Sequence, residues 1–188
     1  MDKAPDPRVE RSRVRVLDAA QELLAECGVG GFSVDEVSRR SGVAKTTIYR
    51  HWPSRETLVL DAASRISAAE TVPDAGSLDA ELRQFLGRLA ELLQTARWSS
   101  LVPSLVDVAE RDGEFAKVHG AIQRGHADPL RQILVRAVQR GELPPTADQG
   151  FLVSALIGPL YYRRWFSREP MDDDFVDHLV GSVARYRR

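Results

Sequence analysis

Basic side chains are concentrated between Arg39 and Arg55, where no acidic residue interrupts them. Clustered guanidinium and ammonium groups create the positive potential that attracts phosphate groups. A solvated helical face carries charges of the same kind, so charge alone leaves two interpretations open: a phosphate-binding surface or an ordinary exposed helix. The basic residues of this stretch are Arg39, Arg40, Lys45, Arg50, His51 and Arg55.

Two short helices are predicted to position these charges. The first spans residues 34–41, where Ser33 can cap the N-terminus and Glu36, three residues later, completes a capping box. Gly42 then allows a tight, left-handed turn, and the second helix spans residues 44–50. Two short helices joined by a turn that contains glycine are typical of a helix-turn-helix. Apolar side chains expected to pack behind this pair are Val37, Val43 and Ile48.

The second of these helices combines an apolar anchor with several outward polar side chains. A recognition helix requires this arrangement, because donors on its outer face must reach base edges and phosphates while the inner face is buried. Trp52, just after the helix, is expected in the core rather than at a contact. The outward residues are Lys45, Thr46, Thr47, Tyr49 and Arg50.

The stretch from Phe32 to Leu58 resembles the DNA-binding signature of the tetracycline-repressor (TetR, AcrR-like) family of transcriptional regulators. The likeness covers about residues 8–69 and departs from the family at Ala44, where many members carry a hydroxyl residue that caps the recognition helix and touches phosphate. One contact with the DNA backbone is therefore expected to be missing. The residues that carry the likeness are Gly42, Val43, Lys45, Thr47, Ile48 and Tyr49, followed by Trp52, Pro53 and Ser54.

The resemblance implies a role for each matching residue. Lys45 and Thr46 are expected at base edges and nearby phosphates, and Arg55 at a phosphate beside the start of the fourth helix, where helix N–H groups assist. Arg50 suits a guanine edge, because its planar fork matches O6 and N7. Tyr49 can also pack its ring on the first helix, and the two roles can coexist. Thr47, Tyr49 and His51 are expected on the DNA backbone, and Ser33 completes the predicted DNA-binding set.

The composition resembles that of an ordinary soluble globular protein, with 43% apolar and 28% charged residues and a net charge of −1. Residues 1–15 are too polar for a signal peptide, and the longest apolar run, residues 151–162, is too short to span a bilayer. The single Cys27 excludes an intramolecular disulfide and a cysteine-rich zinc site. A reducing, cytoplasmic location is therefore expected.

The fold class is predicted to be all-α, because apolar residues recur at helical spacing and no alternating strand pattern is present. A turn-rich break at residues 72–77 separates an N-terminal DNA-binding domain with a linking fourth helix, residues 1–69, from a ligand-binding and dimerisation domain, residues 70–188. Pro129 is expected to kink or split a long helix. The other predicted helices span residues 8–26, 55–69, 78–95, 100–110, 114–140, 146–167 and 172–187.

In TetR-like proteins the core of the C-terminal half holds an inducer pocket, and the resemblance implies a pocket here. Large apolar residues at helical spacing are more often plain core, so both interpretations stay open for its lining. His119 and His126 are seven residues apart, but such pairs are usually solvated or packed, so no metal is expected. The expected pocket lining is Phe85, Trp98, Leu105, Phe115, His119 and Trp165.

The helix predicted at residues 146–167 is apolar around nearly its whole circumference, and such a helix must be enclosed on every side. One small domain struggles to enclose it, so a second copy is expected to cover part of it. The resemblance implies that the last two long helices pair with their two-fold mates in a four-helix bundle. The expected interface residues are Phe151, Leu152, Ala155, Leu156, Pro159, Phe175, Leu179 and Val183.

These expectations describe a sequence-specific DNA-binding transcriptional regulator, a repressor that binds a palindromic operator as a homodimer and is released by an unknown small-molecule inducer. No cofactor and no membrane partner are expected. The alternatives are a helical small-molecule-binding enzyme and a protein–protein adaptor with a vestigial DNA-binding head. No glycine loop for phosphate, metal-spaced cluster or nucleophile elbow supports the enzyme, and the basic cluster argues against the adaptor.

Overall fold

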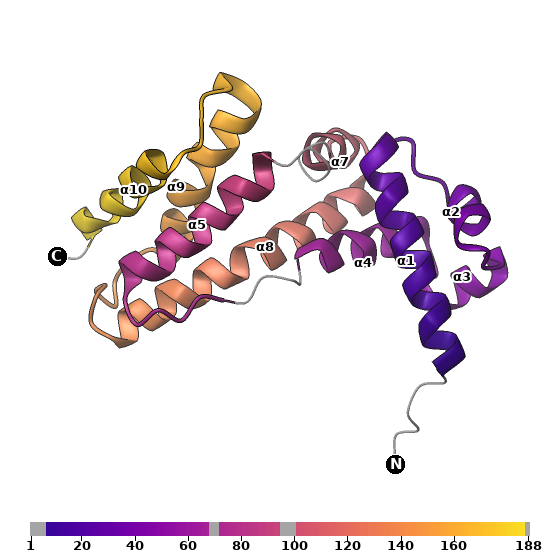
Figure 1. The fold of residues 1–188 in the computed structure, drawn as a ribbon, viewed down its shortest axis with the longest axis horizontal. Coiled ribbons are helices and arrows are strands. Elements are labelled where there is room, and N and C mark those ends of the chain that lie inside the picture. Colours follow the sequence, from indigo (N-terminus) through magenta and orange to yellow (C-terminus); the bar gives the residue numbers. More distant parts are fainter. Residues whose placement is uncertain (1–6, 68–71, 95–100, 187–188) are drawn as a thin grey trace, which may run out of the picture. The chain divides into compact units, whose positions relative to one another are not determined.

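The computed structural model describes residues 7–67, 72–94 and 101–186, and every regular element within these ranges is helical (Figure 1). None of the helices described is long and apolar enough to cross a membrane. The elements are α1 (Pro7–Cys27), α2 (Val34–Ser41), α3 (Lys45–His51), α4 (Arg55–Ser67), α5 (Leu78–Gln94), α7 (Leu101–Ala109), α8 (Gly113–Gln139), α9 (Gln149–Tyr162), the π-helix η1 (Arg163–Ser167), α10 (Asp173–Ser182) and the 3₁₀-helix η2 (Val183–Tyr186).

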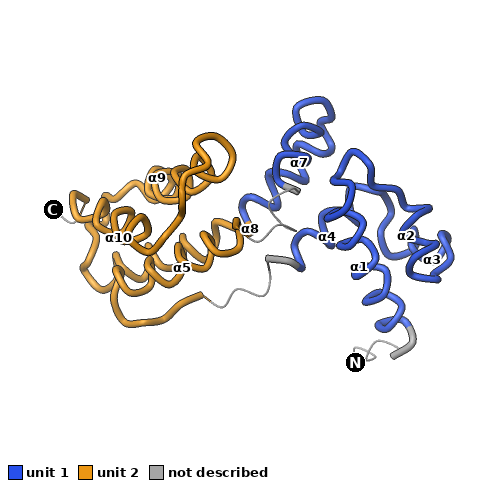
Figure 2. Tube along the Cα trace, turned by 45° about the horizontal axis from the view of Figure 1, so that its top comes forward, with its two compact units in different colours: residues 1–69, 97–124 blue, residues 70–96, 125–188 orange. Residues whose placement is uncertain are grey.

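The chain forms two compact units that do not follow a single boundary (Figure 2). Unit 1 contains residues 1–69 and 97–124, and unit 2 contains residues 70–96 and 125–188. The chain therefore passes from one unit to the other within α8. This helix continues through Pro129, so the proline does not divide it as the sequence had suggested.

The core of unit 1 is built on the apolar stripe of α1. This helix packs against α2 and α4, and its inward positions recur every three or four residues, as the helical period requires. After α1 the backbone turns at Gly28, whose φ is +64°; an added Cβ would come within 2.4 Å of the Ser104 hydroxyl oxygen. The fully buried core side chains here include Ala20, Leu24, Val37, Leu58, Val59 and Ala62.

Unit 2 surrounds a second core formed by α5, α9, α10 and the C-terminal half of α8. Each helix contributes leucines, isoleucines or valines from one face, and side chains of Asp148 and Asp172 cap the starts of α9 and α10. Carboxylates at these positions accept backbone N–H groups and favour the positive end of the helix dipole. Fully buried members of this core include Leu82, Leu86, Leu130, Ile133, Leu134, Leu156 and Leu160.

A buried carboxylate, Glu81 of α5, ties this core to the end of α8. Its side chain is 0% exposed and accepts hydrogen bonds from Arg136 at 3.0 Å and Arg140 at 2.9 Å. Burial alone would raise the pKa of Glu81, but the hydrogen bonds from Arg136 and then Arg140 outweigh it and lower the pKa. Because the folded-state pKa is depressed, the stabilisation is present at neutral pH and is lost as the pH falls through that value.

Replacement of Glu81 by glutamine is expected to lower the free energy of unfolding at pH 7 by about 1–2 kcal/mol, because Arg136 loses its charged partner and Arg140 keeps only Glu142. Urea unfolding of both proteins between pH 7 and pH 3 measures this difference, which should shrink as Glu81 of the parent protein becomes protonated. Glu91→Gln, at an exposed position on the same helix, is the control. A difference that stays constant over this pH range would contradict the assigned role of the charge.

Candidate nucleic-acid interface

The turn between α2 and α3 is fixed by local hydrogen bonds. Gly42 has a left-handed conformation, with φ +66°, and its N–H donates to the Ser38 carbonyl. The Ser38 hydroxyl in turn donates to the Val43 carbonyl at 2.7 Å. Val37 and Ile48 are buried on the inner faces of the two helices. The helix-turn-helix predicted around Gly42 is therefore present, and Ser38, which the sequence analysis did not single out, helps to hold it.

The capping box predicted at the start of α2 does not form. Ser33 has the extended backbone of a capping residue, but its side chain makes no capping hydrogen bond. Glu36 instead accepts hydrogen bonds from Arg39, the shortest of 2.6 Å, and from Arg40 at 2.8 Å. These bonds, from Arg39 first and then Arg40, lower the pKa of Glu36 to about 2. The two guanidinium groups bring positive charge and three N–H donors to the carboxylate, whereas the Ser33 backbone offers it one uncharged donor, which explains why Glu36 binds the arginines.

The basic cluster seen in the sequence is partly neutralised in the fold. Arg40 pairs with Glu26 at 2.7 Å, in addition to its bond with Glu36. Lys45 pairs with Asp35 at 2.5 Å, and this hydrogen bond raises the pKa of Lys45. All three acidic partners precede the basic stretch in sequence, so the stretch itself gave no sign of them.

The outer face of α3 carries the side chains expected of a recognition helix. The exposed residues of this face are Lys45, Thr46, Tyr49, whose accessible fraction is 42%, and Arg50. Among the lysine and arginine side chains of the basic stretch, Arg50 alone makes no hydrogen bond or ion pair with the described residues. Such an exposed guanidinium can bind an acceptor on DNA without breaking a hydrogen bond within the described part of the protein.

The flanks of α3 separate contact positions from core positions. Thr47 and His51 are partly exposed, which leaves their predicted contacts with the DNA backbone open. Ala44 stands at the N-cap and has no capping side chain, as the departure from the family pattern predicted. Trp52 is buried, and its indole N–H donates to Asp61 at 2.8 Å, which confirms its place in the core.

Arg55, at the start of α4, is held inside unit 1. Its Nε donates to the Phe32 carbonyl at 3.1 Å, a terminal nitrogen donates to the Val29 carbonyl, and the guanidinium lies 4.8 Å from the centre of the Phe115 ring. The Val29 N–H donates to the Ser104 hydroxyl at 2.7 Å. These bonds use Nε and one terminal nitrogen, so a phosphate contact would have to use the other terminal nitrogen or replace a bond to a carbonyl. The phosphate contact implied for Arg55 by the resemblance stays a prediction.

The residues predicted for an inducer pocket are divided between the two units. Leu105 and Phe115 are buried in unit 1, where Phe115 is the ring beneath Arg55. Phe85 is buried in the core of unit 2. The remaining members are His119, partly exposed in unit 1, Trp165, partly buried in unit 2 beside Tyr161, and Trp98, which lies outside the described residues. Their assignment to one pocket stays a prediction.

The residues predicted for the dimer interface are partly exposed and partly buried, because unit 2 covers one side of α9 with its own helices. Of the set, Phe151 is exposed, at 51%. Two more aromatic residues of the predicted apolar helix are exposed further along the chain: Tyr162, at 58%, and Phe166, at 75%, with their ring centres 5.7 Å apart in a stacked arrangement. Ala155, Pro159 and Phe175 are partly exposed, whereas Leu152, Leu156, Leu179 and Val183 are buried in the core of their own chain.

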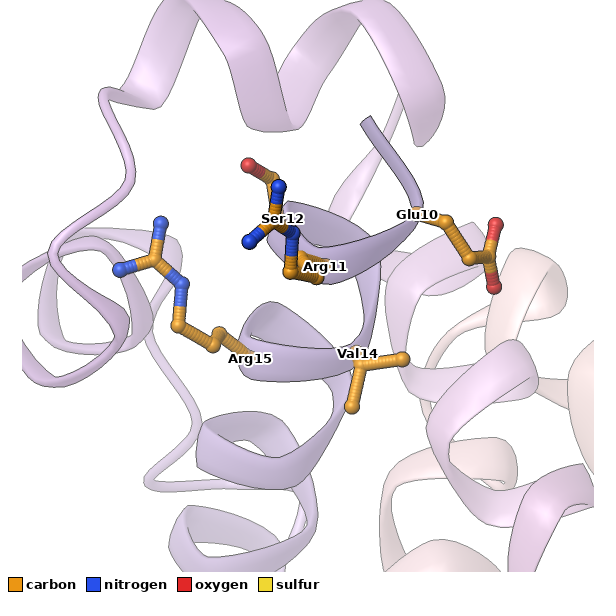
Figure 3. Close-up of a pocket in the computed structure, with 5 residues that line it drawn as sticks. All are labelled: Glu10, Arg11, Ser12, Val14 and Arg15. Carbon is orange, nitrogen blue, oxygen red and sulfur yellow. The ribbon is translucent and has the colours of Figure 1, made fainter. Parts of the chain in front are cut away.

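A shallow hollow lies along the first turns of α1 (Figure 3). In that view Glu10 extends to one side of the helix and Arg15 to the other. The lining that the structure describes comes from α1 alone, with Arg11, Ser12 and Val14 between those two residues. Within the described ranges, no three histidine, cysteine or acidic side chains gather in a way that would hold a metal ion.

Comparison with known proteins matches both parts of the chain. Residues 16–62 match the family described as bacterial regulatory proteins, tetR family, and residues 72–183 match the tetracyclin repressor-like C-terminal domain. The DNA-binding transcriptional repressor TetR of Mycobacteroides abscessus is 31% identical over 94% of this chain and 93% of its own length. The transcriptional regulator YdeS of Bacillus subtilis is 27% identical over 95% of this chain and 91% of its own length.

A solved structure, that of the TetR family transcription regulator SCO0332, has the same fold. It superposes with a TM-score of 0.76 at 30% sequence identity, over 93% of this chain and 97% of that protein. The helix-turn-helix with its outward α3 residues, the helical C-terminal unit and these matches lead to one assignment. The chain belongs to the TetR family, and it is a DNA-binding transcriptional regulator.

Proposed function

We propose that the protein is a repressor that binds a palindromic operator as a homodimer and leaves it when a small molecule binds. The observation that carries the proposal is the outer face of α3, where Lys45, Thr46, Tyr49 and Arg50 are exposed together on a helix anchored by the buried Ile48. Residues 1–69 would supply DNA binding, and residues 70–188 ligand binding and dimerisation. The Mycobacteroides abscessus relative is a repressor, which supports the direction of regulation.

The aromatic surface, formed by the stacked and exposed rings of Tyr162 and Phe166, supports the homodimer. Large apolar side chains exposed next to one another cost free energy in water, and a second copy that covers them would recover it. In a two-fold dimer the same surface meets itself, so a single aromatic surface per chain is sufficient. The two α3 helices would then enter successive major grooves, about 34–36 Å apart on one face of the duplex.

Release by a small molecule follows from linkage between two sites. A ligand lowers operator affinity only if it binds the conformation that does not fit DNA more tightly than the conformation that does. The expected cytoplasmic setting and the helical C-terminal domain are consistent with a metabolite or drug as that ligand. Its binding site is distinct from α3, so ligand and DNA need not compete directly.

Selection of binding sequences from a random duplex pool tests the proposal. We expect an inverted repeat, and sedimentation of the complex should give two chains per repeat. The double substitution Tyr162→Glu and Phe166→Glu should produce monomers and weaken binding to the full repeat, because a charged surface cannot pair with itself. Val135→Glu, at an exposed apolar position on α8, is the matched control and should stay dimeric. A selected site without a repeat, bound equally well by the double variant, would contradict the proposal.

A further inference from the structure

Three arginines border a cavity at the end of unit 2 that the proposed function does not use. The cavity has a volume of about 450 Å³, within the range of about 300–1,000 Å³ that small-molecule sites occupy. Its walls come from the end of α5, from η1 and from the segment that leads to α10. The described residues that line it are Gln94, Arg163, Arg164, Arg168, Glu169, Pro170 and Met171.

Arg168 has a backbone conformation that seldom carries a side chain. Its φ is +61° and its ψ is +19°, the left-handed region, and in the described part of the chain it is the only residue other than glycine with a positive φ. It caps the π-helix η1, at a position where glycine is usual because a Cβ is disfavoured there. Single π-helical turns are rare and often mark functional sites. A long charged side chain at such a position is unusual, and strained backbone of this kind is found most often at functional sites.

Arg163 holds the wall of the cavity in place. Its Nε lies 3.4 Å from a Glu169 carboxylate oxygen, a terminal nitrogen donates to the Pro170 carbonyl, and its guanidinium lies 3.7 Å from the centre of the Phe175 ring. On the opposite side, the Gln94 amide donates to the Met171 carbonyl at 3.3 Å. Hydrogen bonds from Arg163 and Gln94 therefore hold the loop that follows η1, and this loop forms part of the cavity wall.

The one acidic side chain among the described lining residues is already engaged. Glu169 is paired with Arg163, and it also accepts a hydrogen bond from the Ser167 hydroxyl at 3.2 Å. Arg168 is exposed and makes no side-chain hydrogen bond or ion pair with any described residue. The cavity lining thus includes two further arginines, Arg164 and Arg168, while the nearby carboxylate of Glu169 is compensated by Arg163.

We propose that this cavity binds the oxyanion group, a phosphate or a carboxylate, of a small molecule. Arg168 is the principal ligand, because a planar fork forms two parallel hydrogen bonds with either group, and Arg164 adds positive charge beside it. The further step, that such a molecule is the effector that releases DNA, rests on the proposed function. The direct binding experiment below is made without DNA and does not depend on that step.

Calorimetric titration of the full chain with pyrophosphate and, separately, with hexanoate tests the site, with sodium chloride at equal ionic strength as the reference. We expect saturable binding of at least one of the two, and which one binds distinguishes a phosphate ligand from a carboxylate ligand. Arg168→Gly should weaken that binding at least tenfold while the thermal midpoint stays unchanged or rises, since glycine relieves the left-handed strain. Arg168→Lys should give an intermediate loss because it keeps the charge without the fork.

Arg131→Ala removes an arginine of α8 elsewhere in unit 2 and serves as the control, with binding unchanged. Absence of saturable binding by both anions, or equal binding by the Arg168→Gly protein, would overturn the proposal. An operator gel shift in the presence of the bound anion then tests separately whether anion binding releases DNA. Anion binding without release of DNA would support the anion site but reject its role as the effector site. Failure of the protein to bind any operator would contradict the proposed function and leave the anion site untouched.

Discussion

Replacement of Arg55 by alanine is expected to lower the free energy of unfolding by about 2–4 kcal/mol, from two charge-assisted hydrogen bonds and one cation–π contact. The loss is large because the carbonyls of Val29 and Phe32 have guanidinium nitrogens as partners. The side chain also covers the ring of buried Phe115. Arg55 therefore links the α1–α2 loop, α4 and the start of α8 within unit 1.

Urea unfolding monitored by circular dichroism measures this loss, and Arg39→Ala provides the control. Arg39 is an exposed arginine whose partner, Glu36, lies on the same helix, so its removal should change stability by less than about 1 kcal/mol. Arg55→Lys should recover only part of the stability, because an ammonium group cannot bond both carbonyls with the geometry of a planar fork. Full recovery of stability by lysine would show that the positive charge alone, without the planar geometry, accounts for the stabilisation by Arg55.

The same variant decides between an internal role and a phosphate contact for Arg55. A lysine or arginine that neutralises one phosphate contributes about 0.9 to the slope of the logarithm of affinity against the logarithm of salt concentration. If Arg55 acts only within the protein, Arg55→Ala leaves this slope unchanged, measured under conditions where the variant is folded. A slope that becomes shallower by about one unit per chain would show that Arg55 binds phosphate.

Replacement of Arg50 by alanine is expected to weaken binding to the selected operator by about 1–3 kcal/mol per half-site, which is the discrimination of one bidentate contact with a base. Arg50 is exposed on α3 and makes no hydrogen bond or ion pair with the described residues, so stability should change little. The expected loss is mainly one of specificity. Arg50→Lys should retain attraction to phosphates while losing recognition at one base pair, because lysine lacks the planar fork.

Fluorescence anisotropy at several salt concentrations, with the selected operator and with a scrambled duplex of equal length, measures the sequence-specific affinity and the attraction to phosphates separately. The ratio of the two affinities should fall for Arg50→Ala, and Arg39→Ala should leave the ratio unchanged. Equal weakening on both duplexes, accompanied by a shallower salt dependence, would assign Arg50 to the phosphate backbone instead. That result would move base recognition to Lys45 and Thr46.

The sequence by itself predicted the all-α fold and the helix-turn-helix, with α2 at its observed bounds and α3 within one residue of its bounds. Those features are local: glycine at the turn and apolar residues every three or four positions act over a few residues of chain. The family resemblance followed from the same short stretch, because the residues that carry it are contiguous in sequence. The capping box failed although it is local, since two arginines compete for Glu36 more strongly than a backbone N–H.

Only the tertiary structure decided the partners of the charged residues and the exposed faces of the apolar ones. Arg55 meets a carbonyl 26 positions earlier, and Arg40 meets Glu26 across 14 positions. Likewise, α9 is apolar nearly all round, and packing within unit 2 determines that Leu156 is buried while Tyr162 is exposed. The physical reason is the same in each case. Pairing and burial depend on which distant segments meet, whereas helical period and turn chemistry depend only on neighbours along the chain.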